Sequence, residues 1–173
     1  ASACGARALT ATSGPGGSLK VEGASYAARA SIPYVLLNVQ RWGTGLGTLD
    51  SGQTDYFKEV KGGGHGDYKN VVYAPCSVQE LVDVAYEAWE VAEKYRVGVT
   101  ILSEAYLGQM MEEVEMPPFK ELPDRGWGID GSGRYGLGEF SVKLRGPNGM
   151  KLRGEVYDQI RKEMQRWDEY GLE

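Results

Sequence analysis

Four short apolar runs follow one another between the N-terminus and residue 103, with amphipathic segments between them. They cover residues 7–12, 34–40, 71–74 and 97–103, and each has the length of a β-strand. Residues 34–40 (YVLLNVQ) form a nearly continuous apolar run rather than an alternating one. Such a run favours a parallel sheet that is covered on both faces.

The segments between these runs predict helices over residues 18–30, 53–60 and 77–95. The third helix is the best defined, because Ser77 and Glu80 have the spacing of a capping box. Its apolar face at helical period comprises Leu81, Val84, Ala85, Ala88, Val91, Ala92 and Tyr95. Alternating strands and helices predict an α/β fold with a doubly wound, mainly parallel sheet and helices on both faces.

The last third of the chain has a different pattern. Residues 117–149 are rich in Pro and Gly and are expected to be irregular. A helical period returns over residues 151–170, with an apolar stripe formed by Leu152, Val156, Ile160, Met164 and Trp167. We therefore expect a domain over residues 1–116, followed over residues 117–173 by a Pro/Gly-rich extension and a C-terminal amphipathic helix.

Composition narrows the classes of function. The net charge of −5 argues against nucleic acid as a partner, because phosphate binding needs a basic face. No apolar run approaches the roughly 20 residues that span a bilayer, and no signal peptide is recognisable, so we expect no membrane partner and a cytoplasmic location. Cys4 and Cys76 are too few for an iron–sulfur cluster and are expected to be reduced, buried thiols. No Cys/His group has metal-site spacing, so no metal ligand is predicted.

The first predicted strand ends in a turn of small residues. Thr12, Ser13 and Gly14 open this turn, and the predicted helix begins directly after Ser18. In a parallel sheet, such a turn leaves N–H groups of the helix N-terminus facing a crevice where an anionic ligand can bind. The alternative, a tight strand-to-helix turn without a ligand, fits these residues equally well.

Two further residues have side chains suited to binding or catalysis. Arg41 follows the second strand, and its planar guanidinium can bind a carboxylate through two N–H groups; the alternative is an ion pair with a structural Asp or Glu. His65 is the only histidine and lies among glycines at residues 62–66. A titratable imidazole there suits a catalytic loop, and the alternative is an exposed or hydrogen-bonded structural group.

Several motifs, in order, resemble the α subunit of the 2-oxoacid:ferredoxin oxidoreductases. Residues 6–19 (ARALTATSGPGGSL) resemble the family's TSGPG segment, and residues 38–41 (NVQR) resemble its arginine-bearing strand. The segments most similar to the branched-chain, 2-oxoisovalerate branch are residues 53–57 (QTDYF), 61–68 (KGGGHGDY) and 107–111 (LGQMM). The similarity extends over residues 1–118, whereas residues 119–173 match only loosely.

This resemblance implies a subunit with a fold like that of the pyrimidine-binding domain of thiamine diphosphate enzymes. Such enzymes oxidatively decarboxylate a 2-oxoacid to an acyl-CoA and pass electrons through iron–sulfur clusters to ferredoxin. A thiamine diphosphate-binding β subunit supplies the diphosphate and Mg²⁺ site, and ferredoxin-like and γ subunits complete the assembly. The resemblance also implies that Arg41 binds the substrate carboxylate and that Thr12, Ser13 and Gly14 lie near cofactor and substrate. The implied substrate is 2-oxoisovalerate, with 2-oxoglutarate or pyruvate as alternatives.

The chain also departs from the family pattern. The family's first segment, which carries a substrate-contacting threonine and the glutamate that activates the aminopyrimidine, has no counterpart here. We therefore expect an N-terminally truncated chain that is inactive alone. Residues 42–47 (WGTGLG) replace the family's glycine-glycine-proline run, and Asp130-Gly131 lacks the context of a thiamine diphosphate metal motif. Two G-x-G-x-x-G patterns at residues 126–136 follow no predicted strand, so we do not interpret them as a dinucleotide site.

The sequence leaves two other classes of function open. A non-catalytic binding or assembly module that kept the fold is the alternative to an enzyme subunit. A transketolase-like C-terminal module is less favoured because its motifs are absent.

Overall fold

The computed structural model describes residues 1–61 and 63–122. The predicted helix over residues 151–170 and the glycine patterns at residues 126–136 lie outside the described residues. The elements in chain order are η1 (Ser2–Cys4), β1 (Leu9–Thr12), α1 (Pro15–Arg29), β2 (Tyr34–Gln40), α2 (Tyr56–Val60), β3 (Val71–Tyr73), α3 (Val78–Tyr95), β4 (Gly98–Glu104) and α4 (Ala105–Gln109).

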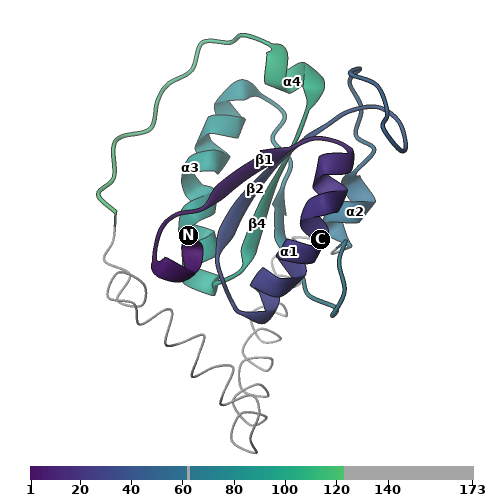
Figure 1. Ribbon diagram of the computed structural model, residues 1–173. Helices are drawn as coiled ribbons and strands as arrows, with labels where there is room; N and C mark the ends of the chain where they lie inside the picture. The colour runs from purple at the N-terminus through teal and green to yellow at the C-terminus, as the bar shows by residue number, and fades with distance from the viewer. Residues whose placement is uncertain (62, 123–173) are drawn as a thin grey trace, which may run out of the picture. The chain divides into compact units, whose positions relative to one another are not determined.

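The strands form one sheet in the order β1-β2-β4-β3, and every neighbouring pair is parallel (Figure 1). Asn38 in the middle of β2 pairs in register with Thr12 of β1 on one side and with Leu102 of β4 on the other. The parallel sheet predicted from the four apolar runs is therefore confirmed. Because all four strands point the same way, the ends of β1 and β2 meet at one edge of the sheet.

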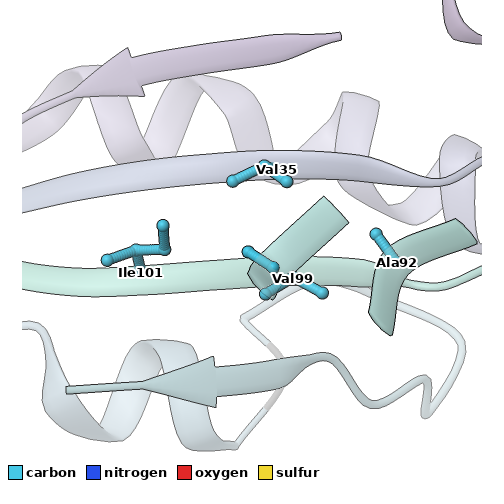
Figure 2. Packing of buried hydrophobic residues seen from close by; sticks show 5 residues of the cluster. Val35, Ala92, Val99 and Ile101 are labelled. Carbon is cyan, nitrogen blue, oxygen red and sulfur yellow. The ribbon is translucent and has the colours of Figure 1, made fainter. Parts of the chain in front are cut away.

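Helix α3 covers one face of this sheet. Its Ala88 and Ala92 are fully buried and pack against Val35, Val99 and Ile101, which project from β2 and β4 (Figure 2). The partly buried residues around this cluster are Leu37, Val71, Tyr73, Leu81, Val84, Ala85, Trp89 and Val91. Burying apolar side chains contributes about 25 cal/mol per Å², so this layer stabilises the fold. The helical stripe read from the sequence is thus the face that meets the sheet.

Helices α1 and α2 lie on the opposite face (Figure 1). This face contains polar residues that are nonetheless buried: Asn38 and Thr100 are fully buried, and Gln40 is nearly so. Asn38 and Thr100 donate hydrogen bonds to Glu59 of α2. Helices therefore cover both faces as predicted, but the face under α1 and α2 mixes these buried polar residues with apolar Leu36 and Leu102.

Helix boundaries follow local chemistry. Helix α1 begins at Pro15, earlier than predicted, because proline is favoured in the first turn, where its missing N–H leaves no unpaired donor. Helix α3 begins after Ser77, whose Oγ accepts a hydrogen bond from the Glu80 N–H at 3.1 Å. The Glu80 carboxylate accepts from the N–H of Cys76 at 2.7 Å, one residue before the partner expected in a capping box. Cys76 lies in this exposed turn, so the prediction that its thiol is buried is wrong.

Residues 110–122 contain no helix or strand and run along α3 (Figure 1). Gln79 exchanges two hydrogen bonds with the backbone of Glu115, at 3.0 and 2.7 Å. Tyr86 donates to the carbonyl of Pro118, and Lys120 pairs with Glu90 of the same helix. Among helices of the described residues, none has both the length and the apolar composition needed to cross a bilayer.

Candidate anion-binding site

The turn between β1 and α1 is the first part of the site. Gly14 is the residue before the helix, and its φ of +54° is a left-handed value that glycine adopts without strain. The Gly16 N–H bonds to the Ser13 carbonyl at 3.2 Å, and the Gly17 N–H bonds to the Gly14 carbonyl at 2.9 Å. A Cβ on Gly16 would lie 2.5 Å from the Oγ1 of Thr12. The predicted residues Thr12, Ser13 and Gly14 therefore sit together around the first turn of α1.

The side chain of Arg41 lies against this turn. A Cβ added to Gly14 would lie 2.8 Å from Nε and 2.9 Å from Nη2 of Arg41. Nη2 donates to the carbonyl of Leu46 at 2.7 Å, whereas Nε is buried and has no hydrogen-bond partner. No Asp or Glu within residues 1–61 and 63–122 forms an ion pair with Arg41. The guanidinium thus contains a buried donor with no hydrogen-bond partner among the described residues.

The loop after Arg41 also holds the guanidinium, through the carbonyl of Leu46. Gly43, Gly45 and Gly47 have φ values of +103°, +63° and +64°, which let the loop turn back on itself. Backbone hydrogen bonds close it, with the Thr48 N–H bonding to the Trp42 carbonyl at 2.8 Å. This path brings the Leu46 carbonyl to Arg41.

A buried carboxylate lies near the same turn. Glu59 of α2 is only 7% exposed and accepts hydrogen bonds from Asn38 Nδ2 at 2.9 Å and from Thr100 Oγ1 at 3.4 Å. The neighbouring Lys58 pairs with it at 2.9 Å. A Cβ on Gly17 would lie 2.6 Å from the ammonium nitrogen of Lys58. A second cation therefore lies at the first turn of α1, and unlike Arg41 it has a carboxylate partner.

The polar cluster continues toward the end of β2. Asn38 Nδ2 also donates to Asp55 at 3.2 Å, and the Asp55 N–H donates to Gln40 Oε1 at 2.9 Å. Asn38 Oδ1 is buried without a partner. No role was predicted from the sequence for four residues of this cluster: Asn38, Gln40, Lys58 and Glu59. The available signal was the pair of polar residues two positions apart in an otherwise apolar strand, because residues two apart share a face of the sheet.

His65 lies elsewhere. Its backbone N–H donates to Ser25 Oγ at 3.3 Å, and Ser25 in turn bonds to the carbonyl of Val21. Ser25 is far along α1 from Gly14, about 16 Å away at the rise of an α-helix. The side chain of His65 is exposed. The structure therefore does not bring His65 to the Arg41 site, and its role in a catalytic loop stays a prediction.

The described residues were also compared with the side-chain groups that hold metal ions. Across residues 1–61 and 63–122, no group of three or more His, Cys, Asp or Glu side chains could hold a metal ion.

A parallel sheet with a glycine turn, a helix N-terminus and an arginine at its carboxyl edge defines an α/β domain of the class that binds anionic ligands in this crevice. Comparison with known proteins identifies the family. The chain belongs to the family described as "Pyruvate flavodoxin/ferredoxin oxidoreductase, thiamine diP-bdg", the thiamine diphosphate-binding domain, which matches residues 1–169.

The chain is similar to two curated relatives and to one solved structure. Ketoisovalerate oxidoreductase subunit VorB of Methanothermobacter marburgensis is 50% identical over 134 residues, which are 76% of this chain and 38% of VorB. The 2-oxoglutarate synthase subunit KorA of Archaeoglobus fulgidus is 41% identical over 122 residues, 70% of this chain and 35% of KorA. The 2-oxoglutarate:ferredoxin oxidoreductase of Magnetococcus marinus, with 2-oxoglutarate, coenzyme A and succinyl-CoA bound, matches with a TM-score of 0.59 and 34% identity over 61% of this chain and 18% of that chain.

These comparisons confirm the family and the fold predicted from the sequence motifs. The relatives are named subunits of 2-oxoacid oxidoreductases. The chain spans 38% or less of the length of each of these relatives. The activity, substrate and partners of a whole enzyme are therefore taken up as proposals.

Proposed function

We propose that this chain is part of the α-type subunit of a 2-oxoacid:ferredoxin oxidoreductase and that Arg41 binds the carboxylate of the 2-oxoacid. One observation carries this proposal: the guanidinium of Arg41 lies at the carboxyl edge of the sheet with a buried, unpartnered Nε. A buried donor without a partner is costly, and a ligand carboxylate satisfies it. The first turn of α1 adds its positive helix end next to the same group.

The reaction we infer is the oxidative decarboxylation of a 2-oxoacid to an acyl-CoA, with ferredoxin as the electron acceptor. The identity to the ketoisovalerate enzyme supports 2-oxoisovalerate as the substrate. The lower identity to the 2-oxoglutarate enzyme keeps 2-oxoglutarate as the second candidate. Pyruvate is the third, and only the family description supports it.

Thiamine diphosphate is the cofactor that the family implies. Gly14, Gly16 and Gly17 carry no Cβ that would collide with Arg41, Thr12 and Lys58, so these three side chains lie against the first turn of α1. We infer that Thr12, Ser13 and Gly14 line the pyrimidine end of the cofactor. When bound, thiamine diphosphate supplies the carbanion that attacks the 2-oxo carbon.

We infer that partner subunits hold the rest of the cofactors. The described residues offer no metal-binding group for the Mg²⁺ that a diphosphate needs. A thiamine diphosphate-binding β subunit is the proposed source of that site, and ferredoxin-like and γ subunits are the proposed carriers of the iron–sulfur clusters. The naming of relatives as lettered subunits supports an assembly of several chains.

In this proposal, the residues of the chain bind and orient. Arg41 neutralises the substrate carboxylate, and the Leu46 carbonyl fixes the guanidinium before the substrate arrives. Donors held in place before binding need no reorganisation when the substrate binds. The bound carboxylate then fixes the position of the neighbouring 2-oxo carbon.

Substitution of Arg41 in the assembled enzyme tests this proposal. Arg41→Ala should lower kcat/KM for the oxoacid by about 30-fold or more, because truncating one partner of a buried charge pair costs about 2 kcal/mol or more. Arg41→Lys should restore only part of this loss, since lysine keeps the charge but not the planar fork. The KM values for coenzyme A and ferredoxin should not change.

The matched control is Arg29→Ala, which removes an exposed arginine at the other end of α1. It should leave kcat/KM for the oxoacid as in the wild type. An Arg41→Ala enzyme with unchanged KM and kcat for the oxoacid would overturn the proposal and leave Arg41 a structural residue of its loop.

The isolated chain gives a second test. We expect it to show no oxoacid oxidation with added thiamine diphosphate, Mg²⁺, coenzyme A and ferredoxin. Its described residues contain no group of side chains that could hold a metal ion. Iron–sulfur clusters need more thiolate ligands than the two cysteines of the chain can supply. Turnover above a no-protein control would contradict the inferred dependence on partner subunits.

A further inference from the structure

We propose that the Lys58–Glu59 pair sets the preference of the Arg41 site for a 2-oxoacid with one carboxylate over a 2-oxoacid with two. This inference rests on the proposed function of Arg41. It starts from the two cations at the first turn of α1. The guanidinium of Arg41 lies against Gly14, and the ammonium of Lys58 lies against Gly17.

Both cations lie against the start of the same helix. Arg41 contacts Gly14, the residue before α1, and Lys58 contacts Gly17 in its first turn. One carboxylate of a molecule such as 2-oxoglutarate can therefore reach Arg41 while the other points toward Lys58. The positive end of α1 lies beneath both positions and favours anions.

The two cations differ in their partners. Arg41 pairs with no carboxylate in the described part of the chain, whereas Lys58 pairs with Glu59 at 2.9 Å. The side chain of Lys58 is 23% exposed and that of Glu59 is 7% exposed. The side chain of Lys58 is thus partly accessible to a ligand. Its positive charge, however, is already balanced by the buried carboxylate of Glu59.

Glu59 cannot readily leave this position. Asn38 and Thr100, both fully buried in the central strands, donate hydrogen bonds to its two carboxylate oxygens at 2.9 and 3.4 Å. A second ligand carboxylate at Lys58 would therefore come close to a fixed negative charge in a poorly solvated place, and like charges there repel strongly. An uncharged hydrocarbon end meets no such repulsion.

The experiment measures kcat/KM for 2-oxoisovalerate and for 2-oxoglutarate with the assembled enzyme. Glu59→Gln keeps the size of the side chain and an oxygen that can accept from Asn38, but it removes the negative charge. The ratio of kcat/KM for 2-oxoglutarate to that for 2-oxoisovalerate should rise about tenfold, as expected for the loss of one charged contact. Most of the change should appear in KM for 2-oxoglutarate.

Lys58→Gln is the second variant, and it leaves the hydrogen bonds of Glu59 to Asn38 and Thr100 in place. Here the same ratio should fall, because an unbalanced carboxylate remains beside the site. Glu22→Gln, which removes an exposed carboxylate on α1, is the control and should not change the ratio. If Glu59→Gln fails to fold, the direction of the Lys58→Gln change decides the question.

The outcomes separate this inference from the proposed function. An unchanged ratio in the folded Glu59 and Lys58 variants, with a large loss in Arg41→Ala, would overturn the role of the pair alone. An unchanged kcat/KM in Arg41→Ala would overturn the proposed function and, with it, this inference.

Discussion

The ring of Tyr34 in β2 lies directly over Gly98 in β4, its partner in the strand register. A Cβ on Gly98 would be 2.4 Å from Cζ and 2.5 Å from the hydroxyl oxygen of Tyr34. The hydroxyl oxygen accepts a hydrogen bond from Asn70 at 3.2 Å, which fixes the ring from the far end. Glycine is therefore required at the start of β4 for the ring to occupy this position.

Replacing this glycine should destabilise the fold. Gly98→Ala forces the Tyr34 ring to move and should lower the free energy of unfolding by about 1–3 kcal/mol, as overpacking does in other proteins. Urea denaturation followed by circular dichroism measures the change. Gly23→Ala is the matched control, because a Cβ at this helical position meets nothing within 4 Å. It should instead stabilise the chain by about 0.5–1 kcal/mol. Equal effects of the two substitutions would show that the ring does not lie on Gly98.

The same tyrosine predicts a dependence of stability on alkaline pH. Burial raises the pKa of Tyr34 from 10.0 to about 12, although the hydrogen bond from Asn70 lowers it in part. Between these values the unfolded chain has lost the phenol proton while the folded chain keeps it, so the folded state binds more protons. Stability contributed by the neutral phenol is thus complete below pH 10 and is lost as the pH rises toward 12.

The expected loss over this window is about 2–3 kcal/mol for one group. Unfolding free energies measured at intervals from pH 9 upward should show this decline. Tyr34→Phe should show a smaller one. Burial also raises the pKa of Tyr73, with the nearby Glu87 adding to the effect, so part of the decline should persist in that variant. The same slope in wild type and Tyr34→Phe would contradict the assignment to Tyr34.

Gly14 should be sensitive for two separate reasons. Its φ of +54° strains any residue with a Cβ, and that Cβ would also lie 2.8 Å from Arg41. Gly14→Ala should therefore cost more stability than Gly45→Ala, which has a similar φ of +63° but nothing within 4 Å. The strain alone costs about 1–2 kcal/mol. A loss of stability in Gly14→Ala no larger than that in Gly45→Ala would mean that the guanidinium does not lie against Gly14.

The N-cap of α3 gives a simpler prediction. Ser77→Ala removes the side-chain oxygen that accepts from the Glu80 N–H and should lower the free energy of unfolding by about 1 kcal/mol. Thermal unfolding of the variant beside Ser51→Ala, an exposed loop position, measures it. If Ser77→Ala and Ser51→Ala melt together, the cap does not contribute.

Much of the fold follows from the sequence because its determinants are local. The apolar run of β2 and the capping residue Ser77 each specify an element without knowledge of distant residues. The position of Arg41 at the sheet edge follows as well, since it is the residue after β2. Its contact with Gly14 also requires that β1 and β2 be neighbours in the sheet. The alternation of strands and helices along the chain suggests this arrangement, and the structure establishes it.

The polar cluster was harder to foresee for a physical reason. Whether Asn38 is a buried anchor or an exposed surface residue depends on which element covers that face of β2. Here α2 covers it, and Glu59 supplies the partner. Helix α2 is only five residues long, too short for a periodic pattern that would reveal its buried side. The loop around His65 has no periodicity at all, so its attachment to Ser25 was not predictable.

The strand order has a consequence for how the chain folds during synthesis. Strand β4 lies between β2 and β3, although it follows both in the sequence. Until residues 98–104 have left the ribosome, β2 and β3 have no strand to join them, and each exposes an unpaired edge. Such edges are prone to pair with other chains. Nascent chains that stall before residues 98–104 have left the ribosome should therefore depend on chaperones more than those in which β4 has emerged.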